Sequence, residues 1–431
     1  MPDSINLILF RKLKSLFKII FYEICSFFFL IIRLVLLFLQ PFILVRIGFV
    51  QSSRIGAIAR FLDRLIHLQK IRKNNRDYYF IFYEKYISNN ALKNLFEKES
   101  KKYKSKVFFF NESIFSKIIR FSYKKYKFGK SFFSYDTDNK NNKSFYFMSG
   151  KEINLKLSLK EEEKGQKYID SLNIPKNKKW ICIHNRDSYY LEKFGPNINE
   201  KAIDTEHFNY HSYRDFDVKD FLKAVSLFND KGYHVFRIGN FQKNKMKYKN
   251  ENFTDYPFSS KKSDFNDIYL LSNCSAYLGS DSGIADVPLI FGKPRYLINY
   301  SLSLIYLFHQ DGSSSSYKNN DSFIFKHFYD RKEQRKLSLK EMFKYDLFKA
   351  GRTDTFKKAG VDLLENTPEE ICDIANETLQ NLNDQKENIN DYEQQKKFWD
   401  IYYDNTNYKR YEDIPVKICS KFLLNNPYIL E

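Results

Sequence analysis

The chain has 431 residues, of which 43% are hydrophobic, and it carries 71 Lys and Arg against 52 Asp and Glu, a net charge of +19. This hydrophobic content is sufficient for two or three folded domains and excludes an intrinsically disordered chain. The five cysteines, at positions 25, 182, 274, 372 and 419, are far apart and form no C-x-x-C pair. Their spacing predicts neither a disulfide framework nor a zinc site and favours a reducing cytoplasm.

The positive charge is concentrated near the amino terminus. The first 130 residues hold 26 Lys and Arg against 8 Asp and Glu, so this part carries +18 of the total of +19. Such asymmetry indicates an anionic partner, either a membrane surface or nucleic acid. The hydrophobic segment beside the basic residues favours an anionic membrane surface over nucleic acid.

Residues 1–41 are predicted to form an apolar, membrane-associating helix that ends at Pro41. Glu23, Ser26, Arg33 and Gln40 recur at intervals of three and seven residues, so they form a narrow polar stripe on this helix. Three interpretations remain open: an interfacial or re-entrant membrane helix, a true span, and a helix buried against the protein. No small-residue cleavage site follows the apolar part, which argues against a cleaved signal peptide.

Residues 42–150 are predicted to form a first α/β domain. Strands alternate with helices along it, which is typical of a parallel sheet with covering helices. The polar loop 50–56 joins the first strand to the first helix. The predicted strands are 42–49, 78–83 and 107–110, and the predicted helices are 57–68, 91–99 and 114–123.

Residues 151–385 are predicted to form a second α/β domain, and 386–431 two closing helices. Capping boxes at Ser158 and Thr367 mark two helix starts. The predicted strands are 180–184, 233–238, 276–278 and 295–299, and the predicted helices begin at 158, 218, 265, 284 and 367. The closing helices are expected at 394–403 and 414–424.

Polar side chains follow three strands of the second domain. His184 to Asp187 end one strand, Arg237 to Asn240 end the next, and Gly279-Ser-Asp-Ser-Gly283 lead from a third strand into a helix. Carboxyl ends of parallel strands meet in one crevice, and a helix amino terminus suits a phosphate. The sequence therefore favours a phosphate site over a plain strand-to-helix turn, with Arg186 and Arg237 as bidentate partners.

Other motifs are weaker. His184 fits a core histidine about as well as a site residue, and His207 with His211 has the spacing of two metal ligands but lacks a third. No Walker A loop, hydrolase nucleophile elbow or H-E-x-x-H motif is present, and Asp136-Thr-Asp138 lies in a polar loop. The sequence therefore predicts no bound metal.

Several segments in order resemble a family of bacterial glycosyltransferases found with surface-carbohydrate genes, which is more distantly similar to GT-B enzymes such as heptosyltransferases and fucosyltransferases. The matching segments cover most of the chain from about Pro41: they are 45–48 with 54–56, 183–187 with 190–191, 211–214, 231–239, 255–256, 263–265 with Asp267, 279–283, 365–371, 394–399 and 422–426. One departure is Ala57, where the family often has a histidine.

The resemblance implies two Rossmann-like, doubly wound domains that face each other across a cleft, the GT-B-like arrangement, preceded by the apolar helix. The amino-terminal domain would hold a glycan or lipid-linked acceptor at the loop of Gln51, Ser53, Arg54 and Gly56. The carboxy-terminal domain would hold a nucleotide-sugar. The residues implied for it are Arg186, Arg214, Arg237, Gly239, Ser280, Asp281, Ser282, Gly283 and Ile284.

The activity implied is a metal-independent sugar transfer in cell-surface polysaccharide biosynthesis, without a cofactor, at the cytoplasmic face of the inner membrane. A general base must lie within reach of the acceptor hydroxyl, and Asp187 is the first candidate, followed by Glu206 and His184. Three other interpretations remain: an inactive membrane-associated scaffold of the same fold, a nucleotide-sugar epimerase, and a nucleic-acid binder.

Overall fold

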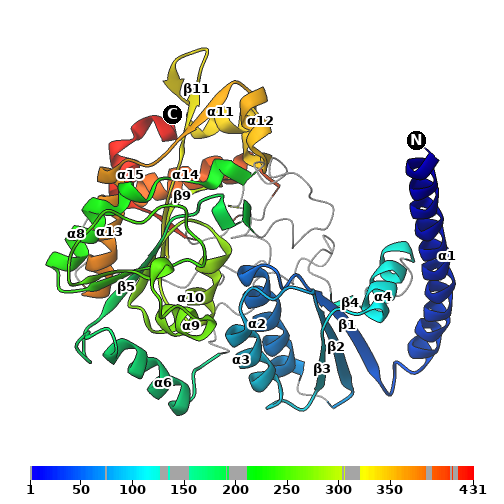
Figure 1. Ribbon diagram of the computed structural model, residues 1–431. Helices are drawn as coiled ribbons and strands as arrows, with labels where there is room; N and C mark the ends of the chain where they lie inside the picture. The colour runs from blue at the N-terminus through cyan, green and yellow to red at the C-terminus, as the bar shows by residue number, and fades with distance from the viewer. Residues whose placement is uncertain are drawn as a thin grey trace.

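The computed structural model describes residues 2–72, 75–126, 134–135, 155–190, 192–193, 211–302, 305, 321–384, 391–407, 410 and 416–431. Two parallel sheets with covering helices face each other, and a long helix lies at one edge of the molecule (Figure 1). The predicted fold class, a GT-B-like α/β arrangement preceded by an apolar helix, is confirmed. The predicted domain boundaries near residues 150 and 385 fall outside the described residues.

The N-terminal domain is built on a parallel sheet with the strand order β3-β2-β1-β4. Alternate residues of the central strand point to opposite faces: Tyr79 and Ile81 pack with the helices that follow β1 and β2, and Phe82 packs under the helix after β3. The strands are β1 (Leu44–Val50), β2 (Asp77–Tyr83), β3 (Lys106–Phe110) and β4 (Ser134–Tyr135), and the helices are α2 (Ile55–Arg72), α3 (Asn90–Ser100) and α4 (Ile114–Lys125).

The C-terminal domain is built on a seven-stranded parallel sheet with the order β14-β10-β9-β8-β5-β6-β7. Its central strands are buried along their whole length, as expected of a sheet covered on both faces. The strands are β5 (Trp180–His184), β6 (His234–Arg237), β7 (Phe253–Asp255), β8 (Ala276–Gly279), β9 (Arg295–Tyr300), β10 (Ser322–Phe325) and β14 (Lys417–Ile418). The covering helices are α6 (Leu159–Asp170), α8 (Leu222–Asp230), α9 (Asp264–Asn273), α10 (Asp286–Ile290), α13 (Pro368–Leu382), η3 (Val218–Phe221), η4 (Tyr256–Phe258) and η5 (Gly283–Ala285).

A small antiparallel sheet and the closing helices complete this domain. The sheet has the order β12-β11-β13. Its strands are β11 (His327–Asp330), β12 (Arg335–Lys336) and β13 (Val361–Leu364), and the helices around it are α11 (Leu339–Lys344), η8 (Leu347–Lys349), α12 (Thr353–Lys358), α14 (Tyr392–Asp404), α15 (Ser420–Asn425) and η9 (Pro427–Leu430). The prediction of one helix over 414–424 is wrong, because residues 417–418 pair with β10 as a strand before α15 begins.

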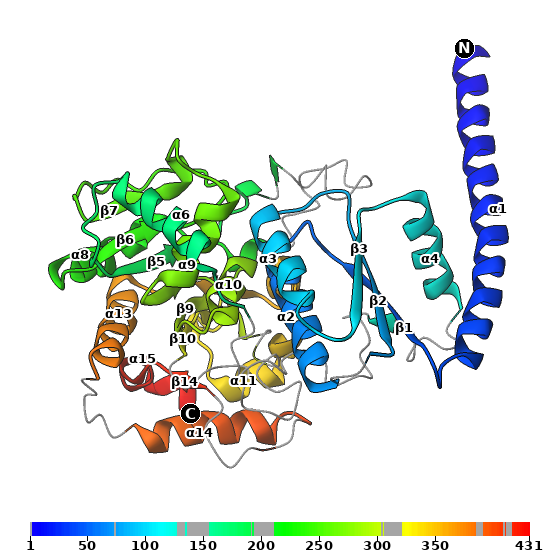
Figure 2. The same cartoon turned by 90° about the horizontal axis from the view of Figure 1, so that it is seen from below.

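Helix α1 (Pro2–Phe38) packs against α4 and ends three residues before Pro41. By its length and composition, the segment Leu13–Phe38 could cross a membrane: its mean hydropathy is 2.3. Within the most apolar stretch of 18 residues, 17% are buried. Figures 1 and 2 show α1 beside α4 and away from the C-terminal domain.

The two domains touch through α2 and α3 on one side and α9 and α10 on the other (Figure 2). Arg60 on α2 forms an ion pair with Asp286 on α10, with 2.8 Å between Nε and Oδ2. The Asn90 amide donates to Oδ2 of Asp264 at 2.7 Å, and Asn89 Nδ2 donates to the Asp264 carbonyl at 3.0 Å. These polar contacts hold the carboxyl ends of both sheets toward a shared space.

Candidate functional site

A cavity of about 500 Å³ lies between the two domains. Its walls are the loops that follow β1, β5, β6 and β8, together with α2, so the carboxyl ends of strands from both sheets meet there, where ligands bind in open α/β sheets. The lining residues are Gln51, Arg54, Ile55, Gly56, Ala57, Arg60, Phe61, Arg64, Ser88, His184, Arg186, Asp187, Tyr190, His211, Arg214, Gly239, Asn240, Phe241, Gln242, Asp267, Asp281, Ser282, Gly283, Ile284 and Asp286.

Five arginines from both domains line this cavity: Arg54, Arg60, Arg64, Arg186 and Arg214. Three of them are paired with aspartates. Arg60 pairs with Asp286, Arg214 Nε donates to Asp281 Oδ1 at 2.9 Å, and Arg186 pairs with Asp215. Arg54 is exposed and forms no ion pair with any residue that the structure describes. The cavity therefore presents guanidinium groups suited to an anionic ligand with several oxygens.

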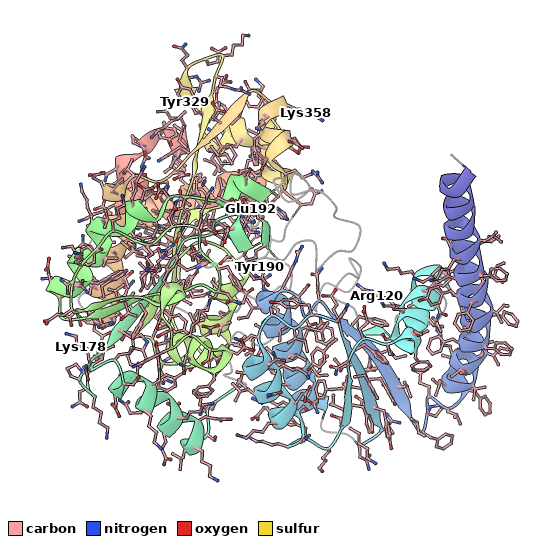
Figure 3. The ribbon with its side chains drawn as sticks, viewed as in Figure 1. Arg120, Lys178, Tyr190, Glu192, Tyr329 and Lys358 are labelled. Carbon is pink, nitrogen blue, oxygen red and sulfur yellow. The ribbon has the colours of Figure 1, made fainter. Side chains whose placement is uncertain are left out.

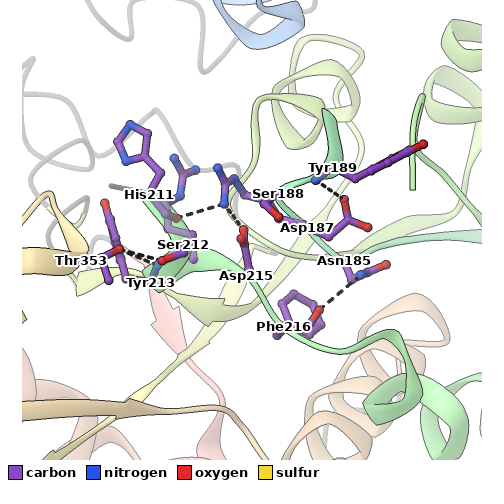
Figure 4. A network of polar contacts seen from close by, with 12 residues as sticks. Asn185, Asp187, Ser188, Tyr189, His211, Ser212, Tyr213, Asp215, Phe216 and Thr353 are labelled. Carbon is purple, nitrogen blue, oxygen red and sulfur yellow. Dashed lines mark hydrogen bonds and ion pairs between the residues drawn. The ribbon is translucent and has the colours of Figure 1, made fainter. Parts of the chain in front are cut away.

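Arg186 is held by the segment that starts at His211. Its Nη1 donates to the His211 carbonyl at 3.0 Å and also contacts Asp215. Nearby, Asn185 Nδ2 donates to the Phe216 carbonyl at 3.3 Å, and Ser212 and Thr353 share a hydrogen bond of 3.0 Å (Figure 4). These bonds fix the loop after β5 against residues 211–216, so the Arg186 side chain is positioned at the cavity wall.

The His211 side chain lines the same cavity among positive charges. Its pKa is lowered to about 3, chiefly by burial and then by the charges of Arg214, Arg186, Arg54 and Arg352 in that order of effect. The imidazole is therefore neutral at physiological pH. His207, its predicted partner as a metal ligand, lies outside the described residues, and among the described ones no group of three His, Cys, Asp or Glu is placed to hold a metal.

Asp187 and His184 both line the cavity, as candidates for a general base. Asp187 accepts hydrogen bonds from the amides of Tyr189 (3.1 Å) and Lys243 (3.0 Å), while burial raises the pKa of its carboxyl. The Nδ1 of His184 lies 2.8 Å from the Ile238 carbonyl, so this nitrogen carries the proton. Burial lowers the pKa of His184 to about 4, which leaves it neutral but weakly basic. Glu206, the remaining candidate, lies outside the described residues.

The segment 279–283 differs from the prediction in two ways. The expected single helix is divided into the short elements η5 and α10, so the argument from a helix dipole is weaker than the sequence suggested. Ser280 is fully buried and does not line the cavity, which corrects its predicted contact with phosphate. Asp281, Ser282, Gly283 and Ile284 do line it, as does Gly239 on the loop after β6.

Arg237 is also corrected by the structure. Its side chain is 1% exposed and lies outside the cavity lining. Its nitrogens donate to the side chains of Asn185 (3.0 Å from Nη2) and Gln242 (2.8 Å from Nη2) and to the Asp255 carboxylate (3.2 Å from Nη1). Arg237 therefore ties the loops after β5 and β6 to the end of β7. Its Nε also donates to Asn185 Oδ1 at 3.2 Å, so no nitrogen is left for a phosphate.

The loop after β1 contributes three of its four predicted residues to the cavity, namely Gln51, Arg54 and Gly56. Ser53 is buried instead: its hydroxyl donates to Glu84 Oε2 at 2.7 Å. Its carbonyl accepts a hydrogen bond of 3.1 Å from the Tyr190 hydroxyl of the C-terminal domain, and Figure 3 shows Tyr190 between the domains. The loop after β5 thus reaches across to the loop after β1.

Four charged lining residues were not predicted: Arg60, Arg64, Asp267 and Asp286. The arginines follow Gly56 at intervals of four residues, the spacing of one helix face, so periodicity alone could have placed them at the cavity. Asp267 and Asp286 carried no such signal, because nothing in the sequence indicates which faces of α9 and α10 meet the other domain.

Comparisons with known proteins add a distant structural likeness. The sequence matches no protein-family model and no curated protein. Among solved structures, the chain is similar to E. coli ADP-heptose lipopolysaccharide heptosyltransferase II, with 11% identity over 78% of this chain and 99% of that one and a TM-score of 0.39. A glycosyl transferase family 9 protein from Veillonella parvula gives 10% identity over 59% and 80% of the two chains, with a TM-score of 0.36.

A third solved structure is an iron-containing dodecameric glycosyltransferase from enterotoxigenic E. coli, with 13% identity over 60% of this chain and 59% of that one and a TM-score of 0.32. All three TM-scores lie below 0.5. The cavity lies at strand ends and contains arginines from both domains, which suits the binding of a diphosphate. Burial raises the pKa of Asp187 in its wall, which suits the removal of a proton nearby.

Proposed function

We propose that the chain is a glycosyltransferase that moves a sugar from a nucleotide-sugar to a glycan or lipid-linked acceptor in cell-surface polysaccharide biosynthesis, without a metal ion. The observation that carries the proposal is the cavity between two parallel sheets, lined by guanidinium groups from both domains. A diphosphate leaving group needs such cations because negative charge grows on it as the bond to the sugar breaks.

In this reaction the acceptor hydroxyl attacks the anomeric carbon, the bond from that carbon to the diphosphate oxygen breaks, and the hydroxyl proton passes to a base. Arg54, Arg186 and Arg214 would balance the nucleoside diphosphate that leaves. Asp187 would take the proton, because it lies in the cavity wall and burial raises the pKa of its carboxyl toward the range of a useful base. His184 is a weaker candidate, since its pKa is lowered.

The C-terminal domain would hold the nucleotide-sugar at residues 281–284 and Gly239, and the N-terminal domain would present the acceptor at Gln51, Arg54 and Gly56. The basic first 130 residues and the apolar α1 support a site of action at the cytoplasmic face of the inner membrane, with peripheral or monotopic attachment. The anionic membrane surface, rather than nucleic acid, is the partner that both features suit.

A binding and turnover assay tests the proposal. The purified chain should bind nucleoside diphosphates and slowly hydrolyse at least one of a panel of nucleotide-sugars when no acceptor is present. Arg54→Ala and Arg186→Ala should each weaken binding about 10-fold or more, as expected for loss of a charge-assisted hydrogen bond. Arg335→Ala is the matched control, because Arg335 pairs with Glu341 outside the cavity lining. Absence of both binding and hydrolysis across the panel would refute the transferase.

A second candidate function is a non-catalytic scaffold of the same fold. Ala57 favours it, because this residue lines the cavity at a position where the resembling family often has histidine. A scaffold would bind a nucleoside diphosphate but release no sugar from any nucleotide-sugar. An epimerase would give a third outcome, a changed sugar that stays on its nucleotide.

A further inference from the structure

Helix α1 carries a continuous apolar row on the side away from the protein. Its members recur at intervals of three and four residues, and each side chain is between 44% and 83% exposed: Leu13, Phe17, Ile20, Ile24, Phe27, Ile31, Leu34 and Phe38. Leu16, Phe28 and Val35 widen the row on both sides and are equally exposed. We call these residues the outer face of α1. An exposed apolar surface of this extent indicates a membrane or a protein partner.

The polar stripe of α1 lies on the opposite side, against α4. Arg33 is 1% exposed; its guanidinium lies 4.5 Å from the Tyr123 ring centroid, and its Nη1 donates to the Tyr126 carbonyl at 3.2 Å. Glu23 forms an ion pair with Lys125. Tyr22 stacks on Phe121 at 5.9 Å between ring centroids. The charged residues within the apolar segment, Glu23 and Arg33, therefore contact the protein and not the outer face.

This arrangement argues against a transmembrane orientation. The α4 contacts involve α1 residues 22–33, the middle of the segment 13–38 that is apolar enough to span. A span would therefore carry α4, on which Figure 3 labels Arg120, into the centre of the bilayer. The side chains of Arg120 and Lys125 on this helix are 44% and 42% exposed. The remaining part of α1, before Tyr22, contains Arg11, Lys12, Lys14 and Lys18, too many charges for a span.

We propose that α1 lies in the plane of an anionic membrane, with its outer face in the hydrocarbon of one leaflet and α4 on its protein side. Lys14 and Lys18 precede Tyr22 at intervals of four residues, so they continue the protein-side stripe at the level of the lipid headgroups. A second copy of the chain fits less well, because a coiled-coil seam is narrow and the outer face is wide.

The proposal deepens the proposed function, on which it rests for the identity of the acceptor. Because α4 covers the same sheet face as α1, an in-plane α1 brings the N-terminal domain against the bilayer. This domain carries the loop proposed to present the acceptor. The geometry therefore points to an acceptor carried on a membrane lipid rather than a free glycan.

Depth-dependent fluorescence quenching distinguishes the two orientations. Phe17, Phe27 and Phe38 on the outer face are each replaced by tryptophan, and the full chain is bound to vesicles of phosphatidylglycerol and phosphatidylcholine brominated near the headgroup or near the chain end. The native Trp180 and Trp399 are 8% and 3% exposed and supply a constant background. Tyr22→Trp, on the side facing α4, is the matched control and should be quenched least.

An in-plane helix predicts the same shallow quenching at all three positions. Phe17 and Phe38 are 21 residues apart, about 30 Å along a helix, so a span would place them at opposite surfaces and Phe27 near the centre. Deep quenching confined to Phe27→Trp would overturn the proposal. So would a failure to bind vesicles, or a dimer in analytical ultracentrifugation that Phe27→Glu dissociates. None of these readouts depends on sugar transfer, so the transferase can fail while the membrane proposal stands.

Discussion

Gly56 in the first turn of α2 and Gly283 at the start of η5 meet backbone to backbone across the domain interface. A Cβ on Gly56 would lie 2.6 Å from the Gly283 Cα and 2.6 Å from Asp286 Oδ2, and a Cβ on Gly283 would lie 3.0 Å from the Gly56 amide nitrogen. The two segments predicted to hold acceptor and nucleotide-sugar therefore touch. At the present distance Gly56 has no space for a side chain, and Gly283 has space only if Gly56 shifts slightly.

Gly56→Ala should force the domains apart at the cavity. Besides the Asp286 carboxylate, the new Cβ clashes with the Cα and the carbonyl oxygen of Gly283, and these backbone atoms cannot rotate away as a flexible side chain can. We expect a larger radius of gyration in small-angle scattering and at least a 10-fold loss of nucleoside diphosphate affinity, because ligands held from both sides lose one wall. Gly351→Ala is the matched control, since a Cβ there meets no atom within 4 Å. Unchanged scattering and affinity for Gly56→Ala would contradict this view of the interface.

The Arg60–Asp286 pair should contribute to domain closure in a way that a double-mutant cycle detects. The Asp286 side chain is 4% exposed and the Arg60 side chain is 35% exposed, so the carboxylate is shielded from solvent and the guanidinium only partly. Arg60→Ala, Asp286→Asn and the double variant should give a coupling free energy of unfolding of about 0.5–3 kcal/mol in urea titrations. Arg295 also lies 3.9 Å from Asp286, so Asp286→Asn alone should cost more than Arg60→Ala. A coupling energy near zero would mean that the pair does not hold the domains.

The strands and loops that form this interface were predicted individually from the sequence. The strands β1, β5 and β8 and the loops after them lie where alternation and Gly/Ser composition place them, because buried parallel strands are apolar throughout and their ends are polar. The pairing of Gly56 with Gly283 was not readable, since it joins residues 227 positions apart and depends on how two domains dock. Arg60 carried a periodic signal that became meaningful only beside Asp286.

Burial was the second property that the sequence could not supply. Arg186 and Arg237 both end apolar strands, yet one lines the cavity and the other is enclosed by Asn185, Gln242 and Asp255. Ser280 and Ser282 are likewise two residues apart in the same segment, yet Ser280 is fully buried and Ser282 lines the cavity. Residue type and position predicted a crevice at these strand ends. They could not distinguish an arginine that lines the cavity, such as Arg186, from one that is buried behind its wall, such as Arg237.

Arg237 and Arg54 should therefore behave in opposite ways when they are replaced. Arg237→Ala leaves Asp255 and Asn185 buried without their partner and should destabilise the protein by about 3–5 kcal/mol. Arg54→Ala removes an exposed side chain and should leave the melting temperature unchanged while nucleoside diphosphate binding weakens. Differential scanning fluorimetry with and without the nucleotide measures both effects. A stable Arg237→Ala protein with impaired binding would restore Arg237 to the binding site and contradict its structural role.

Asp267 should make stability depend on pH. This carboxyl is 8% exposed in the cavity wall, and burial raises its pKa to about 7 from the ordinary value of 3.8. The folded protein therefore holds a proton that the unfolded chain releases, so this group lowers stability as the pH rises from about 4 to about 7. Asp267→Asn removes the effect, and its stability relative to wild type should increase by up to about 4 kcal/mol between pH 4 and pH 8, at about 1.4 kcal/mol per pKa unit.

Urea unfolding of both proteins across this pH range measures the difference. The buried histidines His184 and His234, whose pKa values are lowered to about 4, oppose the trend by favouring unfolding as the pH falls below about 6.5. They are present in both proteins, so their contribution cancels in the comparison. Asp230→Asn, at an exposed carboxylate on α8, is the matched control. A stability difference between Asp267→Asn and wild type that stays constant with pH would show that the Asp267 carboxyl is solvated in solution and that the cavity is more open than its wall residues indicate.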